Sequence, residues 1–352
     1  AHRENNMKRQ HPSSGHAVLP RSAQDFRRPL VLCAALTAAG PCFAAQTTDL
    51  TSLSLEQLLD ISVVGASKYE QKQNEVAATV SVLTRQEIKA FGWRTLDEAL
   101  ASLPGVYTTY DRQYAYLGTR GFGLPGDFNT RILVTINGNR INDPTFDTGP
   151  FGRQFPLDMD LVERIEFIAG PGGAVYGQNA MFGVVNVITR KGGEVDGTEL
   201  AVAYQRPQAT REGRVSFGKR LDNGLDVIVS VSAMRSRGED NFFDFGSAGV
   251  SGVAAGLDGD RDREFFARVM RGPWSFDFVH GNHRKDDPTG AYKADPLVAG
   301  QYQGDRYDVA QLQYQDRWTP SVQVSARLFM GRERYDSRLS YGTVYGFPAT
   351  GQ

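Results

Sequence analysis

The stretch AGPGGAVYGQNAMFGVVNVITRKGG, residues 169–193, decides the fold of this chain. Its glycines follow an apolar run, which is where a nucleotide-binding protein places its phosphate-binding loop. A dinucleotide fingerprint requires G-x-G-x-x-G at the start of a helix that crosses over to a parallel strand. Gly170 and Gly172 fit that pattern, but Val175 stands in place of the third glycine. Only residues 173–181 separate the turn from the next β-branched run, which is too few for a crossover helix, so a nucleotide site is not expected.

The composition limits the classes of protein to which the chain can belong. Its 352 residues suffice for two domains, and a formal net charge of -1 gives no reason to expect a nucleic-acid partner. Hydrophobic residues make up 40% of the chain and 38 residues are glycine, a turn-rich composition that differs from that of a disordered chain. No apolar run of about 18 residues follows position 45, so a membrane-crossing part would have to consist of strands.

Residues 1–44 are typical of an upstream segment that ends in a secretory signal peptide. Two arginines at 27 and 28 precede the apolar run 30–39, and small residues then end the segment near Ala44. The alternative is a short buried helix. Both cysteines, Cys33 and Cys42, fall inside this segment, so the mature chain would have no thiol for disulfides, zinc ligation or catalysis.

Residues 76–190 have the mixed pattern of a compact α+β domain. Thr84 with Glu87, and Thr95 with Glu98, are capping boxes that predict two short helices. A strand followed by Asn137-Gly138 predicts a tight hairpin. The predicted strands of this domain are 79–83, 131–136, 164–168 and 183–190.

Residues 194–352 have the pattern of strands alone, each about as long as a tilted membrane-crossing strand. In one of them Val227, Val229, Val231 and Ala233 alternate with serines, which predicts one apolar and one polar face. The eight predicted strands are 198–206, 211–219, 225–235, 264–271, 274–282, 307–318, 322–333 and 338–345.

Short and long connections alternate between these strands. The connections 221–224, 272–273 and 319–321 are short, whereas 236–263 and 283–306 are long and polar. Outer-membrane barrels have short periplasmic turns and long extracellular loops, whereas a soluble β-sandwich has no reason to alternate in this way. The pattern therefore favours a membrane barrel.

Four motifs resemble the plug domain of TonB-dependent outer-membrane receptors, in the order found in that family. They are SLPGV (102–106), TRGFG (119–123), RILVTINGNRIND (131–143) and LVERIEFIAGPGGAVYGQNAMFGVVNVITR (161–190). The resemblance implies an α+β plug domain followed by a membrane all-β barrel, antiparallel and incomplete here, with about eight of the family's roughly 22 strands. We therefore expect the chain to be a fragment or a truncated gene product. Gly170, Gly172, Gly173 and Gly177 would then serve tight turns and close backbone approach between plug strands and the barrel wall.

The resemblance also implies how such a protein works. A receptor of this family binds a bulky nutrient outside the cell and moves its plug when TonB, energised by ExbB and ExbD, pulls a segment near the N-terminus. The periplasmic arm, residues 45–75, contains a candidate TonB box, which is extended and apolar enough to add as a strand to TonB. Its residues are Asp60, Ile61, Ser62, Val63 and Val64. The alternative is an ordinary first strand of the plug.

Family analogy suggests two sets of site residues within the plug. Aromatic side chains could stack on cargo or, equally, pack against the barrel interior; they are Tyr110, Tyr114, Tyr116, Phe146 and Phe151. Charged side chains resemble plug positions that pair with the barrel wall, surface solvation being the alternative; they are Arg120, Glu163, Arg164 and Glu166.

Neither metal-binding nor catalytic chemistry is expected. Asp258, Asp260 and Asp262 alternate as in a calcium loop but lack its glycine and closing glutamate, and His280 with His283 are too few for a zinc site. No catalytic constellation is present, so we expect no enzyme and no cofactor.

The resemblance implies active uptake across the outer membrane of a Gram-negative bacterium, most often of a ferric siderophore. The alternatives are a cobalamin, haem or glycan receptor of the same family, or a non-functional truncated barrel or periplasmic plug module. A passive porin or adhesin barrel needs neither a plug nor a TonB box. The expected partners are TonB with ExbB and ExbD, outer-membrane lipid and a small-molecule cargo, and no nucleic acid.

Overall fold

The computed structural model describes residues 62–63, 71–72, 79–124, 126–246, 249–319 and 321–342. The predicted signal segment lies outside these residues, as do Asp60, Ile61 and Val64 of the candidate TonB box. Strand β1 (Ser62–Val63) pairs antiparallel with β2 (Gln71–Lys72). Within the described part of the chain, no helix is long and apolar enough to cross a membrane.

The plug is built on a five-stranded sheet with the strand order β3-β8-β9-β6-β7. Strands β6 and β9 are parallel, and the other neighbours are antiparallel. The predicted strands of this domain are confirmed to within two residues. The elements are β3 (Thr79–Thr84), α2 (Arg85–Phe91), α3 (Leu96–Leu100), β4 (Val106–Tyr110), β5 (Ala115–Thr119), β6 (Ile132–Ile136), β7 (Asn139–Arg140), η3 (Met159–Leu161), β8 (Val162–Ala169), α4 (Gly173–Tyr176) and β9 (Gly183–Thr189).

The two predicted capping boxes have different outcomes. At α2 the Thr84 hydroxyl accepts the Glu87 N–H at 3.3 Å, and the Glu87 carboxylate accepts the Thr84 N–H at 2.7 Å. Thr95 is the N-cap of α3 but its side chain makes no capping bond. The Glu98 carboxylate instead accepts the N–H of Arg94, the residue before the N-cap, at 2.7 Å. The predicted second capping box is therefore wrong, because the Glu98 carboxylate binds the N–H of Arg94 and not that of the N-cap residue, Thr95.

Thr84→Ala is expected to destabilise α2 by about 1 kcal/mol, because the first turn loses its capping oxygen. Backbone amides of α2 should then exchange with solvent deuterium about fivefold faster, as measured by mass spectrometry on the folded protein. Thr95→Ala is the matched control, since that side chain makes no capping bond to α3. Equal acceleration in the two helices would contradict the role given to the Thr84 hydroxyl.

The stretch 169–193 contains the connection between β8 and β9, the whole of β9 and the start of α5. Strands β8 and β9 pair antiparallel, and α4 between them has only four residues, so no parallel crossover unit exists here. Gly170 has φ +113° and Gly177 has φ +76°, conformations that favour glycine. A Cβ on Gly172 would lie 3.0 Å from Val184 Cγ2, whereas one on Gly173 would meet nothing within 4 Å. The expectation of a close approach to the barrel wall is therefore wrong: the nearest atoms at Gly170 and Gly172 belong to the plug, and nothing lies within 4 Å at Gly173 or Gly177.

The rest of the chain forms one antiparallel sheet of seven strands in the order β10-β11-β12-β15-β16-β17-β18. A hairpin, β13–β14, lies in the long β12–β15 connection and was not predicted. The predicted strand 338–345 is not formed in the described part, since Arg338 ends β18 and residues 339–342 are not in a strand. The elements are α5 (Gly192–Val195), β10 (Gly197–Gln205), β11 (Thr210–Arg220), β12 (Asp226–Ser236), β13 (Phe242–Phe245), β14 (Val250–Val253), β15 (Asp260–Arg271), β16 (Trp274–Asp286), η5 (Ala291–Lys293), β17 (Tyr302–Thr319) and β18 (Val322–Arg338).

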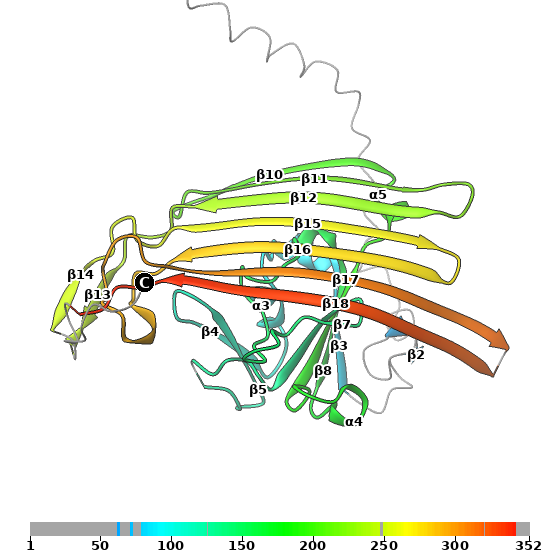
Figure 1. Cartoon of the computed structure of the whole chain (residues 1–352), viewed down its shortest axis with the longest axis horizontal. Helices are drawn as coiled ribbons and strands as arrows, with labels where there is room; N and C mark the ends of the chain where they lie inside the picture. Colours follow the sequence, from blue (N-terminus) through cyan, green and yellow to red (C-terminus); the bar gives the residue numbers. More distant parts are fainter. Residues whose placement is uncertain are drawn as a thin grey trace, which may run out of the picture. The chain divides into compact units, whose positions relative to one another are not determined.

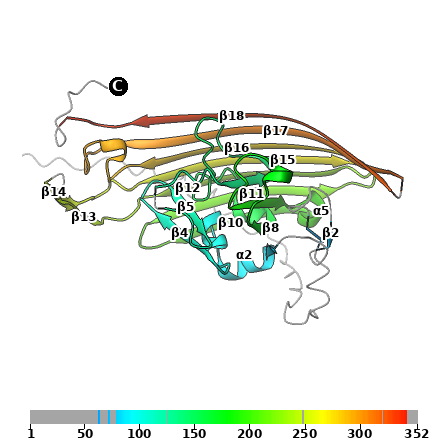
Figure 2. The same ribbon diagram turned by 90° about the horizontal axis from the view of Figure 1, so that it is seen from below.

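The seven-stranded sheet lies along one side of the plug (Figures 1 and 2). The turns β11–β12, β15–β16 and β17–β18 lie at one end, and the long connections with β13, β14 and η5 lie at the other, together with the short β10–β11 turn (Figure 1). We call the second end the long-loop end. The β4–β5 hairpin of the plug points toward it (Figure 1).

The two faces of the sheet differ as predicted. Along β12 the serines Ser230 and Ser232 are buried, while Val231 and Ala233 on the other face are exposed. Inward-facing Ile228 joins the hydrophobic core of the plug, as do Phe266, Val279 and Val309 of the neighbouring strands. The architecture is therefore the expected one, an α+β plug followed by an incomplete antiparallel barrel, and the two parts share one core.

Candidate functional site: the interface between the plug and the barrel wall

An aromatic cavity of about 470 Å³ lies between the plug loops and the inner face of β17 and β18, near the long-loop end. We call it the aromatic cavity. Its rim carries Asp143, Asp305, Glu333 and Arg334. Seven aromatic side chains line it: Tyr114, Tyr116, Phe128, Phe146, Tyr292, Tyr307 and Tyr335.

An aspartate turn fixes the plug tyrosines at the tip of the β4–β5 hairpin. The Asp111 carboxylate accepts the N–H groups of Gln113 and Tyr114 at 2.8 Å each, and the Tyr116 hydroxyl at 2.7 Å. The Tyr114 hydroxyl donates to Asp305 on the wall at 3.1 Å. Burial, with these carboxylates beside them, raises the pKa of Tyr114 and Tyr116 well above the usual range, so both phenols stay protonated.

A second aspartate turn fixes the loop that carries Phe146. The Asp143 carboxylate accepts the N–H groups of Thr145, Phe146 and Thr148 at 2.8 Å each. Phe146 is 62% exposed and stacks on Phe128 with ring centroids 6.1 Å apart. The loop therefore presents a flat apolar face to the cavity.

The five aromatic residues predicted to contact cargo have three different surroundings. Tyr114, Tyr116 and Phe146 line the aromatic cavity. Tyr110 lines a separate, more polar cavity of about 300 Å³, beside Arg112. Phe151 is fully buried in the plug core with 0% exposure, so its place in the cargo set is wrong.

Four aromatic residues of the cavity were not predicted. Tyr307 lies on the inner face of the predicted strand 307–318, where the alternation of faces could have found it. Tyr335 lies on β18 beyond the end of the predicted strand 322–333, because the observed strand is longer than predicted. Phe128 and Tyr292 lie in connections, where the sequence carries no such signal. Their positions depend on how the loops fold over the wall.

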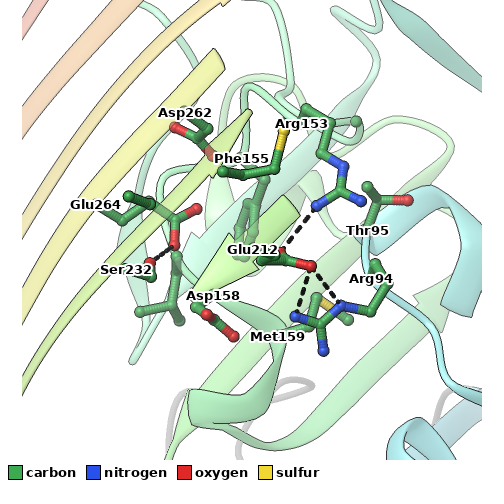
Figure 3. A pocket seen from close by; sticks show the side chains of 14 residues that line it. Arg94, Thr95, Arg153, Phe155, Asp158, Met159, Glu212, Ser232, Asp262 and Glu264 are labelled. Atoms are coloured by element: carbon green, nitrogen blue, oxygen red, sulfur yellow. Dashed lines mark hydrogen bonds and ion pairs between the residues drawn. The ribbon is translucent and has the colours of Figure 1, made fainter. Parts of the chain in front are cut away.

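Charged contacts fasten the plug to β11 (Figure 3). Glu212 accepts from two plug arginines, Arg94 at 3.0 Å and Arg153 at 3.2 Å. Burial alone would lower the pKa of Arg94, but the hydrogen bond and charge of Glu212 outweigh it and hold that pKa above its usual value. A carboxylate shared by two guanidinium groups is a strong link because each hydrogen bond is charge-assisted.

Two further links lie beside Glu212. Arg214 of the wall lies 3.8 Å from Asp158 and 3.4 Å from Asp160 of the plug. Arg190 at the end of the plug pairs with Glu199 of β10 at 2.8 Å. The plug is therefore held to β10 and β11 by ion pairs in which some plug residues carry the positive charge and others the negative charge.

Three of the four charged residues predicted to pair with the wall, Arg120, Arg164 and Glu166, have partners within the plug instead. Arg164 pairs with Glu166 at 2.9 Å, two residues along the same strand. Arg120 donates to the Ala169 carbonyl at 3.3 Å. Burial and the nearby Glu194 raise the pKa of Glu163. The prediction is corrected: strand alternation brings Arg164 and Glu166 to the same face of β8, where they meet each other before they meet the wall.

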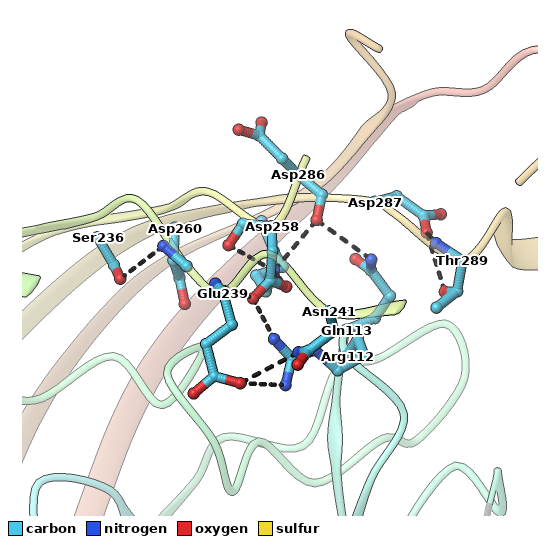
Figure 4. Close-up of polar contacts among 12 residues, drawn as sticks. Arg112, Gln113, Ser236, Glu239, Asn241, Asp258, Asp260, Asp286, Asp287 and Thr289 are labelled. Carbon is cyan, nitrogen blue, oxygen red and sulfur yellow. Dashed lines mark hydrogen bonds and ion pairs between the residues drawn. The ribbon is translucent and has the colours of Figure 1, made fainter. Parts of the chain in front are cut away.

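Arg112 links the β4–β5 tip to the long β12–β15 connection (Figure 4). Its guanidinium pairs with Asp258 and lies 3.6 Å from Glu239. Asp258 also accepts from the buried Lys285 at 2.5 Å. The plug tip is thus tied to the long-loop end through one aspartate that two cations share.

The two histidines and two of the three aspartates that the sequence suggests as metal ligands, Asp258 and Asp260, are paired with other side chains. His283 lies 2.9 Å from Asp260, and His280 lies 2.6 Å from Asp308. Among the described residues, no group of three or more His, Cys, Asp or Glu side chains is placed to hold a metal ion.

Comparisons with known proteins all find similarity to outer-membrane receptors and their plug domain. Residues 72–184 match the family model of the TonB-dependent receptor plug domain. The ferric-catecholate import receptor Fiu from E. coli K12 has 16% sequence identity and a TM-score of 0.56, over 78% of this chain and 41% of that one. The ferric citrate transporter FecA has 19% identity and a TM-score of 0.58, over 80% of this chain and 44% of that one.

A third solved structure gives the same result. The ferric yersiniabactin uptake receptor FyuA from Yersinia pestis has 17% identity and a TM-score of 0.54, over 76% of this chain and 42% of that one. This chain spans about two fifths of the length of the solved structures that it matches. At these identities the similarity concerns the fold.

Proposed function

From the premise that this chain is a TonB-dependent receptor, represented by its plug and the first strands of its barrel, we propose that it takes up a bulky nutrient across the outer membrane. The cargo we propose is a ferric siderophore. Solved structures with the same fold are named as receptors for ferric complexes. Cobalamin, haem and glycans are the alternative cargoes.

One observation carries the proposal. The aromatic cavity lies at the long-loop end, and it is formed jointly by the plug and the wall. A cargo bound there would touch the plug and the wall together, so movement of the plug would dismantle its binding site. That coupling is what an active transporter requires and what a passive pore does not use.

We propose that residues 60–64 are the segment on which TonB, energised by ExbB and ExbD, acts. In the structure Ser62–Val63 is extended and pairs with only two residues of β2. So short a pairing costs little to break, and the freed strand could add to the edge of a sheet in a partner.

The function is tested in the native host by deleting the gene and measuring uptake of labelled ferric siderophores. We expect uptake to fall on deletion, to stop when TonB is absent, and the protein to be found in the outer-membrane fraction in larger amounts under iron starvation. Outer-membrane location without an iron response would shift the cargo to cobalamin or a glycan. A soluble periplasmic location would refute the proposal.

Phe146→Ala is expected to raise the Kd for cargo about tenfold, the equivalent of about 1.4 kcal/mol, because the cavity loses one side of a stacked aromatic pair. Equilibrium binding to the purified receptor measures this change.

Phe91→Ala is the matched control for Phe146→Ala. Phe91 is 70% exposed and stacks on Trp93 at 5.0 Å, but it lies on α2 and does not line the cavity. Its replacement should leave the Kd unchanged. A similar loss of affinity in both variants would mean that the effect is structural and that the cavity is not the cargo site.

A further inference from the structure

The rim of the aromatic cavity is mainly negative. Three carboxylates, Asp143, Asp305 and Glu333, face one guanidinium, that of Arg334. Two of these carboxylates already have partners in the protein: Asp143 accepts three backbone N–H groups, and Asp305 accepts the Tyr114 hydroxyl. Asp305 also lies 4.0 Å from the His283 ring. The third carboxylate is different.

Glu333 lines two cavities and has no partner in the described part of the chain. Its carboxylate borders the aromatic cavity and an adjoining cavity of about 380 Å³. It lies opposite Tyr307 in the β17–β18 ladder, so both face the plug. Arg334 also lines the aromatic cavity and Arg332 the adjoining one, but neither forms an ion pair with Glu333 within the described residues.

A partly buried carboxylate beside aromatic side chains, without a partner among the described residues, has a defined ligand preference. Tyrosine hydroxyls and aromatic faces around it accept flat, weakly charged groups. The carboxylate itself favours an ammonium or hydroxyl donor and disfavours an approaching anion, more strongly than in water because the surroundings are partly desolvated. A polyanionic complex would meet three carboxylates and one cation.

We propose that the aromatic cavity selects a ferric complex of zero or positive net charge, and that Glu333 accepts a hydrogen bond from a donor group of that complex. The inference rests on the proposed function and narrows it to one charge class of cargo. Glu333 is then the residue that determines charge specificity at this end of the receptor.

The test compares two iron complexes of opposite charge in a strain whose other ferric-siderophore receptors are deleted. The probes are radiolabelled ferrioxamine B, a cationic hydroxamate complex, and a trianionic ferric tris-catecholate. The native receptor should import the cation at least tenfold faster than the trianion at equal concentration. Glu333→Gln should raise the KM for the cation about tenfold, and Glu333→Lys should abolish its uptake and increase that of the trianion.

Asp336→Asn is the matched control. Asp336 lies three residues along the same strand, on its other face, and does not line the cavity, so its loss should leave both uptake rates unchanged. Outer-membrane levels of every variant are measured by immunoblot. Binding of the gallium complexes to the purified receptors gives a second readout that does not depend on energy supply.

The outcomes separate this inference from the function on which it rests. Faster import of the trianion by the native receptor, or unchanged selectivity in both Glu333 variants at normal protein levels, would overturn the inference and leave the proposed function standing. Failure of the native receptor to import any ferric complex would overturn both.

Discussion

Glu212→Ala is expected to loosen the plug from the barrel wall. The substitution removes the shared acceptor of Arg94 and Arg153 and leaves two guanidinium groups without it in a partly buried interface. Truncating one partner of such a buried charged contact costs about 2–5 kcal/mol. We expect the lower part of that range, because the Arg94 side chain is still 26% exposed.

Hydrogen exchange by mass spectrometry measures this loosening. A loss of about 2 kcal/mol corresponds to about 30-fold faster exchange for amides protected by the plug–wall contact. The affected segments should be α3 and the loop that carries Arg153. Outer-membrane leakage of a large hydrophilic antibiotic should increase in parallel, because the plug obstructs the barrel less firmly.

Two control variants separate the contact from a general charge effect. Glu212→Gln keeps the shape and one acceptor oxygen, so its effect should be smaller than that of Glu212→Ala. Asp222→Asn removes one negative charge from an exposed turn and should change neither exchange nor leakage. If Glu212→Ala leaves exchange at α3 unchanged, the contact does not hold the plug.

Val63→Pro is expected to reduce uptake to the level of a strain without TonB, while cargo binding remains normal. Proline has no backbone N–H and fixes φ near -65°, so it prevents the segment from adding as a strand to a partner sheet. Uptake of labelled cargo and equilibrium binding, measured on the same variant, distinguish a loss of energy coupling from a loss of the site.

The control places the same change elsewhere in the arm. Gln73→Pro lies ten residues further along, outside the candidate TonB box, and should preserve uptake. Normal uptake by Val63→Pro would refute the box and favour the alternative, in which Ser62–Val63 is an ordinary first strand of the plug.

Sequence reasoning found the secondary structure because the relevant signals are local. Alternating serines and valines in β12 set its two faces, and Asn137-Gly138 set the β6–β7 hairpin. The capping box predicted at Thr95 does not form although its residues fit the motif, because the Glu98 carboxylate accepts the N–H of Arg94 instead. A motif gives the residues that are able to form a bond, and the backbone path decides which bond forms.

At the candidate site, the difference between what local sequence predicts and what the tertiary structure decides is larger. Phe146 and Phe151 are only five residues apart and alike in sequence, yet one is exposed in the cavity and the other is buried in the core. Arg164 was expected to reach the wall and instead meets Glu166, while Glu212, in a strand with no distinguishing motif, holds two plug arginines. Arg153 and Arg94 precede Glu212 by 59 and 118 positions, respectively. Contacts between residues so far apart in the sequence leave no periodic pattern from which they could be predicted.

The sequence by itself determined the α+β plug, the antiparallel strands with one apolar and one polar face, the alternation of short and long connections, and the exclusion of a nucleotide site. These follow from turn chemistry and from the two-residue period of a strand, which act over a few residues. Only the tertiary structure decided which aromatic side chains share a cavity, which charges join the plug to the wall, and that Glu333 faces the cavity with no partner among the described residues. Those depend on the register between strands and on the fit of two parts of the chain against each other.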